Sequence, residues 1–404
     1  MIPRLSPSFN HLDLFSVLQN HSGKDDIASF EDALITFTGR RHALAFPMAR
    51  SGLFALIKAL GWHNREIIVP AYTCAVVPNA IMASGNRPVF VDVDANDFNM
   101  RADLVHAALS PKTVAVVATH MYGFPMDLDA LADGLADRND IMVIQDCALG
   151  LGTSFSDQPV HQKNDVAMFS FSLGKQISTV EGGMLTFDDT NTYESVKKVR
   201  DEIFSPPPAR RYLFQYLMLV GAHLGLTPHM YPLIYALKNN TNILNAITNY
   251  FKNDEIVVAN NFFESMPSFL ARLGILQLEQ ADELLAIRKR NSLRLMKTAR
   301  QQPGLECPTP RAGSSWSHVP CLVEHRGAFI THMAKYGVNV GTEVFDYALP
   351  EMPVYEQFSK GTFNVAKRIS LQIATLPNHP RLRPSDLDQI EDGLRAWRGS
   401  AGMS

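Results

Sequence analysis

The sequence predicts an α/β protein built on a mostly parallel sheet, and three observations support this prediction. Short apolar runs alternate with helix-compatible stretches between about residues 40 and 190, which is typical of βαβ units. The runs are almost continuously apolar, as expected for strands that are buried on both faces of a sheet. The chain has 404 residues, 46% of them apolar and 19% charged, which is enough for about two or three domains with sizeable cores.

The predicted elements follow one another in strand–helix order. The expected strands are residues 66–70, 88–92, 114–118, 141–144, 166–171 and 183–187. The expected helices between them are residues 52–60, 76–83, 102–109 and 128–135. Periodicity then predicts one long amphipathic helix over residues 268–300, and a final helix over residues 386–397 closes a mixed α+β region. We therefore expect a large domain over residues 1–265, and a bridging helix with a small C-terminal α+β domain over residues 266–404.

Residues 205–257 interrupt this order as an apolar insertion in the large domain. Pro206-Pro-Pro208 breaks the chain, and residues 212–237 then contain no Asp, Glu, Lys or Arg. This run would cover a bilayer, which needs about 20 apolar residues, but Pro228 and Pro232 disfavour a single span. We expect a hairpin of two helices that is buried on the protein or at an oligomer interface, or that lies at a membrane surface. A full span is the third alternative.

Composition and charge narrow the class of partners and the cellular location. Thirty-seven Lys and Arg residues against 40 Asp and Glu residues give a formal net charge of −3, so we expect no nucleic-acid partner. The four cysteines (Cys74, Cys147, Cys307 and Cys321) form no CxxC pair and have no zinc-like spacing, which predicts reduced thiols and no metal site. The N-terminus lacks the apolar stretch of a signal peptide. These features predict a cytoplasmic protein, with possible peripheral contact through residues 212–237 at the inner face of a membrane.

Three polar features stand where a parallel sheet places its ligands. Ser51-Gly52-Leu53 opens a predicted helix, where free N–H groups suit a phosphate, although a serine is also a common N-cap. Asp146 follows the strand 141–144, where ligands bind in open α/β sheets, although an aspartate there can equally cap the next helix. Lys175 lies on a Gly-flanked turn, where it is either solvated or, if desolvation lowers its pKa, able to form a Schiff base.

Several segments in a fixed order carry a family resemblance. They are Ser51-Gly-Leu53, Ile68-Val-Pro-Ala-Tyr-Thr73, Pro88-Val-Phe-Val-Asp-Val-Asp94, His120-Met-Tyr-Gly123, Asp146-Cys-Ala-Leu-Gly150, Ser170-Phe-Ser-Leu-Gly-Lys175, Glu181-Gly-Gly183 and residues 368–380. Over residues 25–200 and 266–395 the chain resembles the DegT/DnrJ/EryC1/StrS aminotransferases, sugar aminotransferases among the fold-type I enzymes of pyridoxal 5′-phosphate (PLP). The resemblance implies a three-layer α/β/α large domain, a smaller C-terminal α+β domain and a homodimer.

The resemblance also implies a role for each residue of the site. Lys175 would hold PLP as a Schiff base and move a proton at the substrate carbon, and Asp146 would pair with the pyridinium nitrogen. The implied cofactor contacts are completed by the phosphate-binding Gly52, Leu53 and Ser170, and by Tyr72, Cys74 and Ala148. Cys74 and Leu149 depart from the family pattern, which has an aromatic ring and a glutamine there. The partner subunit's asparagine has no clean equivalent, although Asn260 or Asn261 could serve.

The reaction that the resemblance implies is transamination between an amino-acid donor, with glutamate expected, and a keto carbon. The acceptor would be a nucleotide-linked keto-sugar for polysaccharide or natural-product biosynthesis. The insertion raises an alternative, a lipid-linked or hydrophobic carbonyl acceptor at a membrane. A PLP-binding regulator without turnover and a PLP enzyme of a different reaction type are two further alternatives. His120, Tyr122 and His379 are pocket residues by resemblance and core or loop residues by default.

Overall fold

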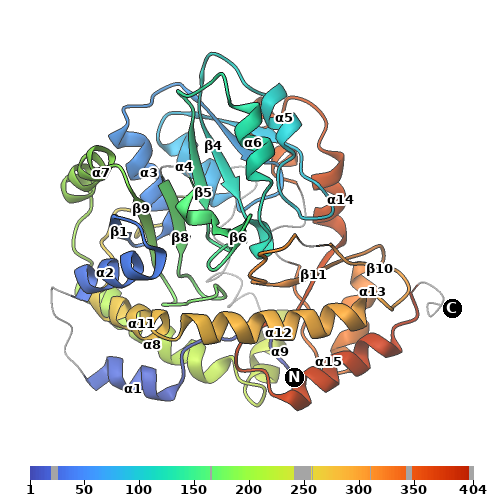
Figure 1. Ribbon diagram of the computed structural model, residues 1–404. Coiled ribbons are helices and arrows are strands. Elements are labelled where there is room, and N and C mark those ends of the chain that lie inside the picture. Colours follow the sequence, from blue (N-terminus) through green and yellow to red (C-terminus); the bar gives the residue numbers. More distant parts are fainter. Residues whose placement is uncertain are drawn as a thin grey trace.

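A seven-stranded sheet organises the large domain of the computed structural model (Figure 1), which describes residues 1–19, 26–163, 166–240, 256, 258–309, 311–342 and 348–399. The strand order is β1-β9-β8-β5-β4-β2-β3. The strands are β1 (His42–Phe46), β2 (Glu66–Pro70), β3 (Arg87–Val91), β4 (Thr113–Thr119), β5 (Met142–Asp146), β8 (Val166–Ser170) and β9 (Gly183–Phe187). Only β9 runs antiparallel to its neighbours in this sheet. The predicted mostly parallel sheet is therefore confirmed.

Helices cover both faces of this sheet, because alternate strand residues point to opposite sides. Ile67 and Val69 join one core, to which α3 (Ala49–Ala59), α4 (Val76–Ala83) and α7 (Thr190–Ile203) contribute. Ile68 joins a second core on the other face. That core is built with α2 (Asp26–Thr38), α5 (Ala102–Ala107), α6 (Leu128–Gly134) and α11 (Ser268–Leu278). The predicted three-layer arrangement is confirmed.

The C-terminal region is the expected smaller α+β unit. Its antiparallel sheet consists of β10 (Leu305–Glu306), β11 (Val319–Val323) and β12 (Ile373–Leu376). Its helices are α13 (Arg326–Lys335), α14 (Asn364–Gln372) and α15 (Pro384–Ala396). The remaining short elements are α1 (His11–Gln19), β6 (Ser154–Phe155), β7 (Gln158–Pro159) and the 3₁₀ turns η1 (Met121–Gly123), η2 (Val160–Gln162), η3 (Leu349–Glu351) and η4 (Pro353–Phe358).

The prediction of one helix over residues 268–300 is wrong, because α11 ends at Leu278 and α12 (Ala281–Ala299) begins three residues later. Gln280 has a non-helical backbone (φ −105°, ψ 8°) that separates the two helices. The two helices meet different parts of the protein. Gly274 of α11 lies against the ring of Phe30 in α2, whereas α12 contacts β11 and α15 (Figure 1). The domain division at residues 265/266 stays a prediction, and α11 packs on the large-domain side of it.

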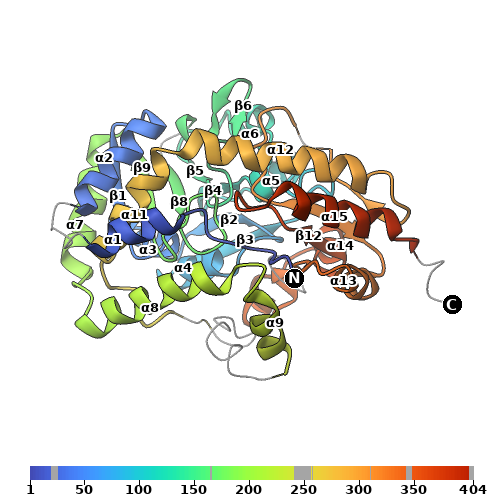
Figure 2. The same ribbon diagram turned by 90° about the horizontal axis from the view of Figure 1, so that it is seen from below.

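The apolar insertion begins with the two predicted helices, α8 (Ala209–Gly225) and α9 (Tyr231–Asn240), which a short turn joins. The N-terminal segment runs past their turn (Figure 2), where the Met1 amino group donates to Pro228 O at 3.2 Å and Ser6 Oγ donates to Leu226 O at 3.1 Å. Among the described residues, no helix combines the length and the apolarity that a membrane crossing requires. Residues 241–255 and 257 of the insertion lie outside the described residues.

Candidate active site

A cavity of about 230 Å³ opens where β2, β4, β5 and β8 end. Ligands bind at this edge in open α/β sheets, because the loops that follow parallel strands converge there. Its lining comes from strand ends, from the loop after β8, from the N-terminal segment and from the small domain. These residues are Leu5, Thr73, Cys74, Thr119, Met121, Tyr122, Asp146, Ala148, Leu149, Leu173, Gly174, Lys175 and His318. Four predicted site residues, Cys74, Asp146, Ala148 and Lys175, therefore meet in one cavity.

Lys175 and Asp146 are the two charged groups of this cavity. Burial lowers the pKa of the Lys175 amine, although the nearby Cys74 and Asp146 oppose the shift. Burial raises the pKa of the Asp146 carboxyl, whereas the backbone N–H of Ala148 (3.0 Å from Oδ1) and the Lys175 charge oppose the shift. A lowered amine pKa increases the fraction of the uncharged, nucleophilic form, which is the form that attacks a carbonyl carbon.

The loop that carries Lys175 is held by buried amide side chains. Gln176 Nε2 donates to Leu149 O and Leu151 O, both at 3.0 Å. Gln277 of α11 brackets Ser178, because its Oε1 accepts the Ser178 N–H (3.0 Å) and its Nε2 donates to Ser178 O (2.8 Å). These contacts fix the turn, so the amine enters the cavity from a defined direction.

The start of α3 differs from the prediction. The helix begins at Ala49, two residues before Ser51, because Ala49 and Arg50 favour helix and follow an extended Met48. The N–H groups of Ser51 and Gly52 already donate to Met48 O, at 3.0 and 3.3 Å. The prediction that Ser51-Gly52-Leu53 opens the helix is therefore wrong in position. A Cβ on Gly183 would lie 2.0 Å from Ala49 N, so only glycine lets β9 approach this helix start.

Two of the predicted cofactor residues lie beside the cavity wall. Tyr72 is buried and does not line the cavity, but its hydroxyl forms a 2.7 Å hydrogen bond with that of Tyr122, which does. Tyr122 has a left-handed backbone (φ 58°), a strained conformation of the kind that clusters at functional sites. Ser170 ends β8, and its Oγ lies 3.2 Å from that of Ser172.

His318 is a cavity residue that the sequence reasoning missed. It comes from the small domain, immediately before β11, and burial lowers its pKa well below the usual range. Its ring contacts that of Tyr122 edge-on at 5.5 Å, and its Nδ1 lies 3.0 Å from Ser317 Oγ. The sequence shows a histidine next to an apolar run, which could have indicated a residue at the end of a strand. It does not show that this segment lies against the large domain.

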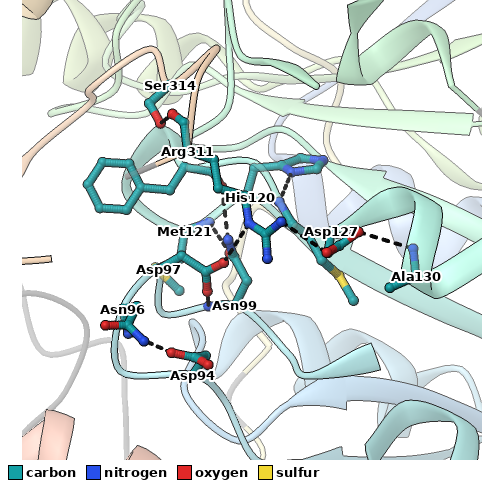
Figure 3. A network of polar contacts seen from close by, with 12 residues as sticks. Asp94, Asn96, Asp97, Asn99, His120, Met121, Asp127, Ala130, Arg311 and Ser314 are labelled. Carbon is teal, nitrogen blue, oxygen red and sulfur yellow. Dashed lines mark hydrogen bonds and ion pairs between the residues drawn. The ribbon is translucent and has the colours of Figure 1, made fainter. Parts of the chain in front are cut away.

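The loop before His318 is fastened to the large domain by an arginine (Figure 3). Arg311 Nη1 donates to Asp127 at 2.9 Å, and its Nε donates to Asp97 at 3.4 Å. Further along, the backbone N–H of Ser315 donates to Gly123 O at 2.9 Å. These contacts join the two domains beside the cavity and bring His318 to it.

Two other histidines proposed by resemblance are core residues. His120 is fully buried, and its Nε2 lies 2.8 Å from Gln145 Oε1. Its Nδ1 accepts the Met126 N–H, and burial lowers the pKa of the ring to about 4. His379 is buried against Pro3 O (3.2 Å), and burial lowers its pKa to about 3. Neither lines the cavity.

The three cysteines other than Cys74, and the two asparagines considered as the phosphate ligand, do not line the cavity. All four cysteines are free thiols, and Cys307 and Cys321 approach to 3.5 Å between their Sγ atoms. Among the described residues, no group of His, Cys, Asp or Glu is arranged to hold a metal ion. Asn261 is buried, and its side chain donates to Glu181, while Asn260 is exposed.

A lysine facing a carboxylate at the carboxyl edge of a largely parallel sheet, in a two-domain α/β chain, defines a fold-type I PLP enzyme. The chain belongs to the DegT/DnrJ/EryC1/StrS aminotransferase family, whose model matches residues 16–395. It is therefore a PLP-dependent aminotransferase. The match covers nearly the whole chain, including most of the small domain and the hairpin.

Individual relatives agree with this assignment. The chain is 26% identical over 375 residues to a GDP-perosamine synthase of Caulobacter vibrioides, covering 90% of this chain and 88% of that one. It is 25% identical over 380 residues to the spore coat polysaccharide biosynthesis protein SpsC of Bacillus subtilis, covering 91% and 88%. Among solved structures, the aminotransferase TlmJ of Streptoalloteichus hindustanus has a TM-score of 0.76 at 24% identity, with 98% of both chains covered. This last likeness shows the fold.

Proposed function

We propose that the enzyme transfers an amino group from glutamate to the keto carbon of a nucleotide-linked sugar, in polysaccharide or natural-product biosynthesis. The observation that carries this proposal is the Lys175–Asp146 pair in one cavity, in a chain of this family. The names of two relatives support the sugar acceptor, since one is a GDP-perosamine synthase and the other a polysaccharide biosynthesis protein.

The residues of the cavity fit the cofactor. Besides the amine and the carboxylate, the lining holds the buried Thr119 Oγ1, which has no hydrogen-bond partner within the described part of the chain. Ser51 Oγ in α3, outside this lining, is a second buried hydroxyl without one. Bound PLP supplies an electron sink for the carbanion formed at the substrate carbon. Lys175 Nζ holds the cofactor and carries the proton to and from that carbon. Asp146 balances a positive charge on the ring nitrogen, and its own burial strengthens this interaction because the local dielectric is low.

The remaining contacts are assigned by the same proposal. The first turn of α3 and the hydroxyl of Ser170 would bind the phosphate, because the positive end of the helix dipole favours an anion. Gly52 and Leu53 would border the phosphate rather than donate to it, since the Gly52 N–H already donates to Met48 O. Cys74 and Ala148 border the ring from the cavity wall, and Tyr72 acts from behind by holding Tyr122.

The absorbance spectrum of the protein with added PLP tests this proposal. We expect a yellow band that bleaches on addition of glutamate, and no such band in Lys175→Ala. Formation of 2-oxoglutarate together with an aminated nucleotide sugar would complete the test. A band that no amino donor bleaches would instead favour the PLP-binding regulator, and no band in the wild type would overturn the assignment.

We further propose that the hairpin of α8 and α9 forms a second surface, because large apolar side chains stand exposed on it. They are Leu213, Phe214, Leu217, Leu224, Met230, Leu233 and Leu237, each at least 42% exposed. Large apolar side chains that are exposed together on a surface mark contacts with another chain or with lipid. A homodimer would cover this face in one case. In the other, peripheral contact with a membrane would favour a lipid-linked or otherwise hydrophobic acceptor.

Two measurements separate these possibilities. Sedimentation velocity gives the mass in solution, and flotation with vesicles of anionic phospholipid measures lipid contact. A dimer that does not float and that dissociates in a Leu213→Ser, Leu217→Ser double variant assigns the face to a second copy. Flotation that is lost in the same variant assigns the face to lipid. A monomer that stays at the bottom of the gradient would contradict both.

A further inference from the structure

Thr119 is a buried hydroxyl at the wall of the cavity that no step of the proposed reaction uses. It is the last residue of β4 and is 5% exposed. Among the residues that the structure describes, its Oγ1 has no hydrogen-bond partner. A buried hydroxyl without a partner loses its hydrogen bonds to water and gains none in return, so such groups are rare in folded proteins.

Its position in the sheet places this hydroxyl beside the carboxylate. In the parallel pair of β4 and β5, Thr119 is in register with Asp146, and neighbouring parallel strands lie about 4.8 Å apart. Residues in register point to the same face, and both of these residues line the cavity. Thr119 and Asp146 therefore approach a bound ring from the same side.

Three other polar side chains that line the cavity already have hydrogen-bond partners. Asp146 Oδ1 accepts from Ala148 N, Tyr122 pairs with Tyr72, and His318 pairs with Ser317. Several of the remaining lining residues, Leu5, Met121, Leu149 and Leu173, offer no hydrogen bond. An occupant of the cavity is thus the partner that the Thr119 hydroxyl lacks.

We propose that Thr119 Oγ1 forms a hydrogen bond with a polar atom on the ring of bound PLP, next to Asp146, and is a positioning residue for the cofactor. This inference rests on the proposed function and adds a ring contact from β4 to it. The hydroxyl fixes the ring against the strand ends, so its loss loosens the cofactor and changes the surroundings of its chromophore.

The test compares Thr119→Val, which removes the hydroxyl and keeps the shape, with a matched control. Thr186→Val is that control, because Thr186 is fully buried in β9, its Oγ1 likewise has no partner among the described residues, and it does not line the cavity. We expect Thr119→Val to raise the PLP dissociation constant roughly tenfold and to shift the absorbance maximum of bound PLP. Thr186→Val should leave both unchanged, and Thr119→Ser should restore both towards wild type.

Three results would overturn the inference. Wild-type affinity and absorbance maximum in Thr119→Val would show that the hydroxyl does not contact the cofactor. Equal effects of Thr119→Val and Thr186→Val, with no rescue by serine, would show a general role in packing. A wild-type protein that binds no PLP would contradict the proposed function as well. The inference alone fails if the wild type and Thr119→Val bind PLP equally tightly, so the two failures can be told apart.

Discussion

Helices α12 and α8 are similar in length, 19 and 17 residues, but their exposed faces differ in polarity. The face that α12 buries includes Leu284, Leu295 and Met296, and most of its exposed residues are charged. In contrast, α8 buries Gln215 and His223 together with Leu219 and Ala222, and it exposes Leu213 and Leu217. Helix α12 therefore keeps most of its apolar side chains inside this chain, whereas α8 divides its apolar side chains between the core and its outer face.

The contacts on the inner side of α8 show how this helix is held on the protein. Below α8, Gln215 and Arg211 both donate to the buried Glu181, and the ring of His223 stacks on Phe9. The comparison shows that a helix can be fixed on one chain and still present an apolar face for another surface. Substitutions on the buried face of α12 should therefore disturb the enzyme itself, and substitutions on the outer face of α8 should disturb only its associations.

The largest effect is expected for Arg288→Met in α12. The Arg288 guanidinium is buried and donates to Asn378 O, and at 3.3 Å to Lys175 O and to Ser8 Oγ. Its removal leaves buried acceptors without a donor, so we expect a loss of about 3 kcal/mol or more in the free energy of unfolding. Urea denaturation measures this loss.

The neighbouring Arg290, which is exposed on the same helix, provides the control for this substitution. Arg290→Met should change the free energy of unfolding by less than about 0.5 kcal/mol. Equal losses in the two variants would contradict the view that the buried face of α12 holds the Lys175 loop.

Acidification should have the next largest effect on stability, because two histidines are buried in the neutral form: His379 near Arg288 of α12, and His223 in α8. Burial, with the charge of Arg288, lowers the pKa of His379 to about 3, and burial also lowers the pKa of His223 under α8. In the unfolded chain each histidine binds a proton near pH 6.5, so below that pH unfolding takes up protons. Stability is therefore complete above about pH 6.5 and falls as the pH drops towards the folded-state pKa values.

The expected slope is at most about 1.4 kcal/mol per pH unit for each such histidine. Thermal unfolding between pH 7.5 and pH 4.5 measures it. Because the pKa of His379 is lowered to about 3, His379→Asn should reduce the slope over this whole range, and His223→Asn should also reduce the slope below about pH 6.5. A stability that does not change over this range would show that these side chains are not buried in the neutral form.

The smallest effect on the folded chain is expected for Leu217→Ser on the outer face of α8. Leu217 is 64% exposed, so the free energy of unfolding should change by less than about 0.5 kcal/mol and amino transfer should not change. Leu295→Ala in α12 is the counterpart, and the cavity that it leaves should cost about 2–5 kcal/mol. A marked loss of stability in the Leu217→Ser variant of the isolated chain would show that the outer face of α8 also contributes to folding.

Much of the large domain could be predicted because its strands have a strong signal. Residues 66–70 and 183–187 match β2 and β9 at both ends, since buried β-branched and apolar runs favour strands. Strand β1 was missed because two of its five residues are alanine, which favours no strand. The break between α11 and α12 was missed because Glu279-Gln280 contains neither proline nor glycine, and the apolar periodicity continues across it.

The candidate site could be predicted only where its residues follow a strand. Asp146 and Lys175 stand at the ends of recognisable runs, and the structure brings them to one cavity. Leu5 and His318 reach the same cavity from opposite ends of the chain, and no local pattern records such a long-range contact. The missing partner of Thr119 is likewise a property of packing, because it depends on what surrounds the side chain.

The pairing of β1 with β9 means that the N-terminal elements can complete their packing only after later residues have been synthesised. β1 has its partner at Gly183–Phe187, and α2 acquires its covering helix only when residues 268–278 exist. An N-terminal fragment that stops before these residues would expose the strand edge and the apolar side of α2 to water. During synthesis on the ribosome, β1 and α2 therefore lack their packing partners until these later residues have been added. We expect chaperones to bind this N-terminal part of the nascent chain.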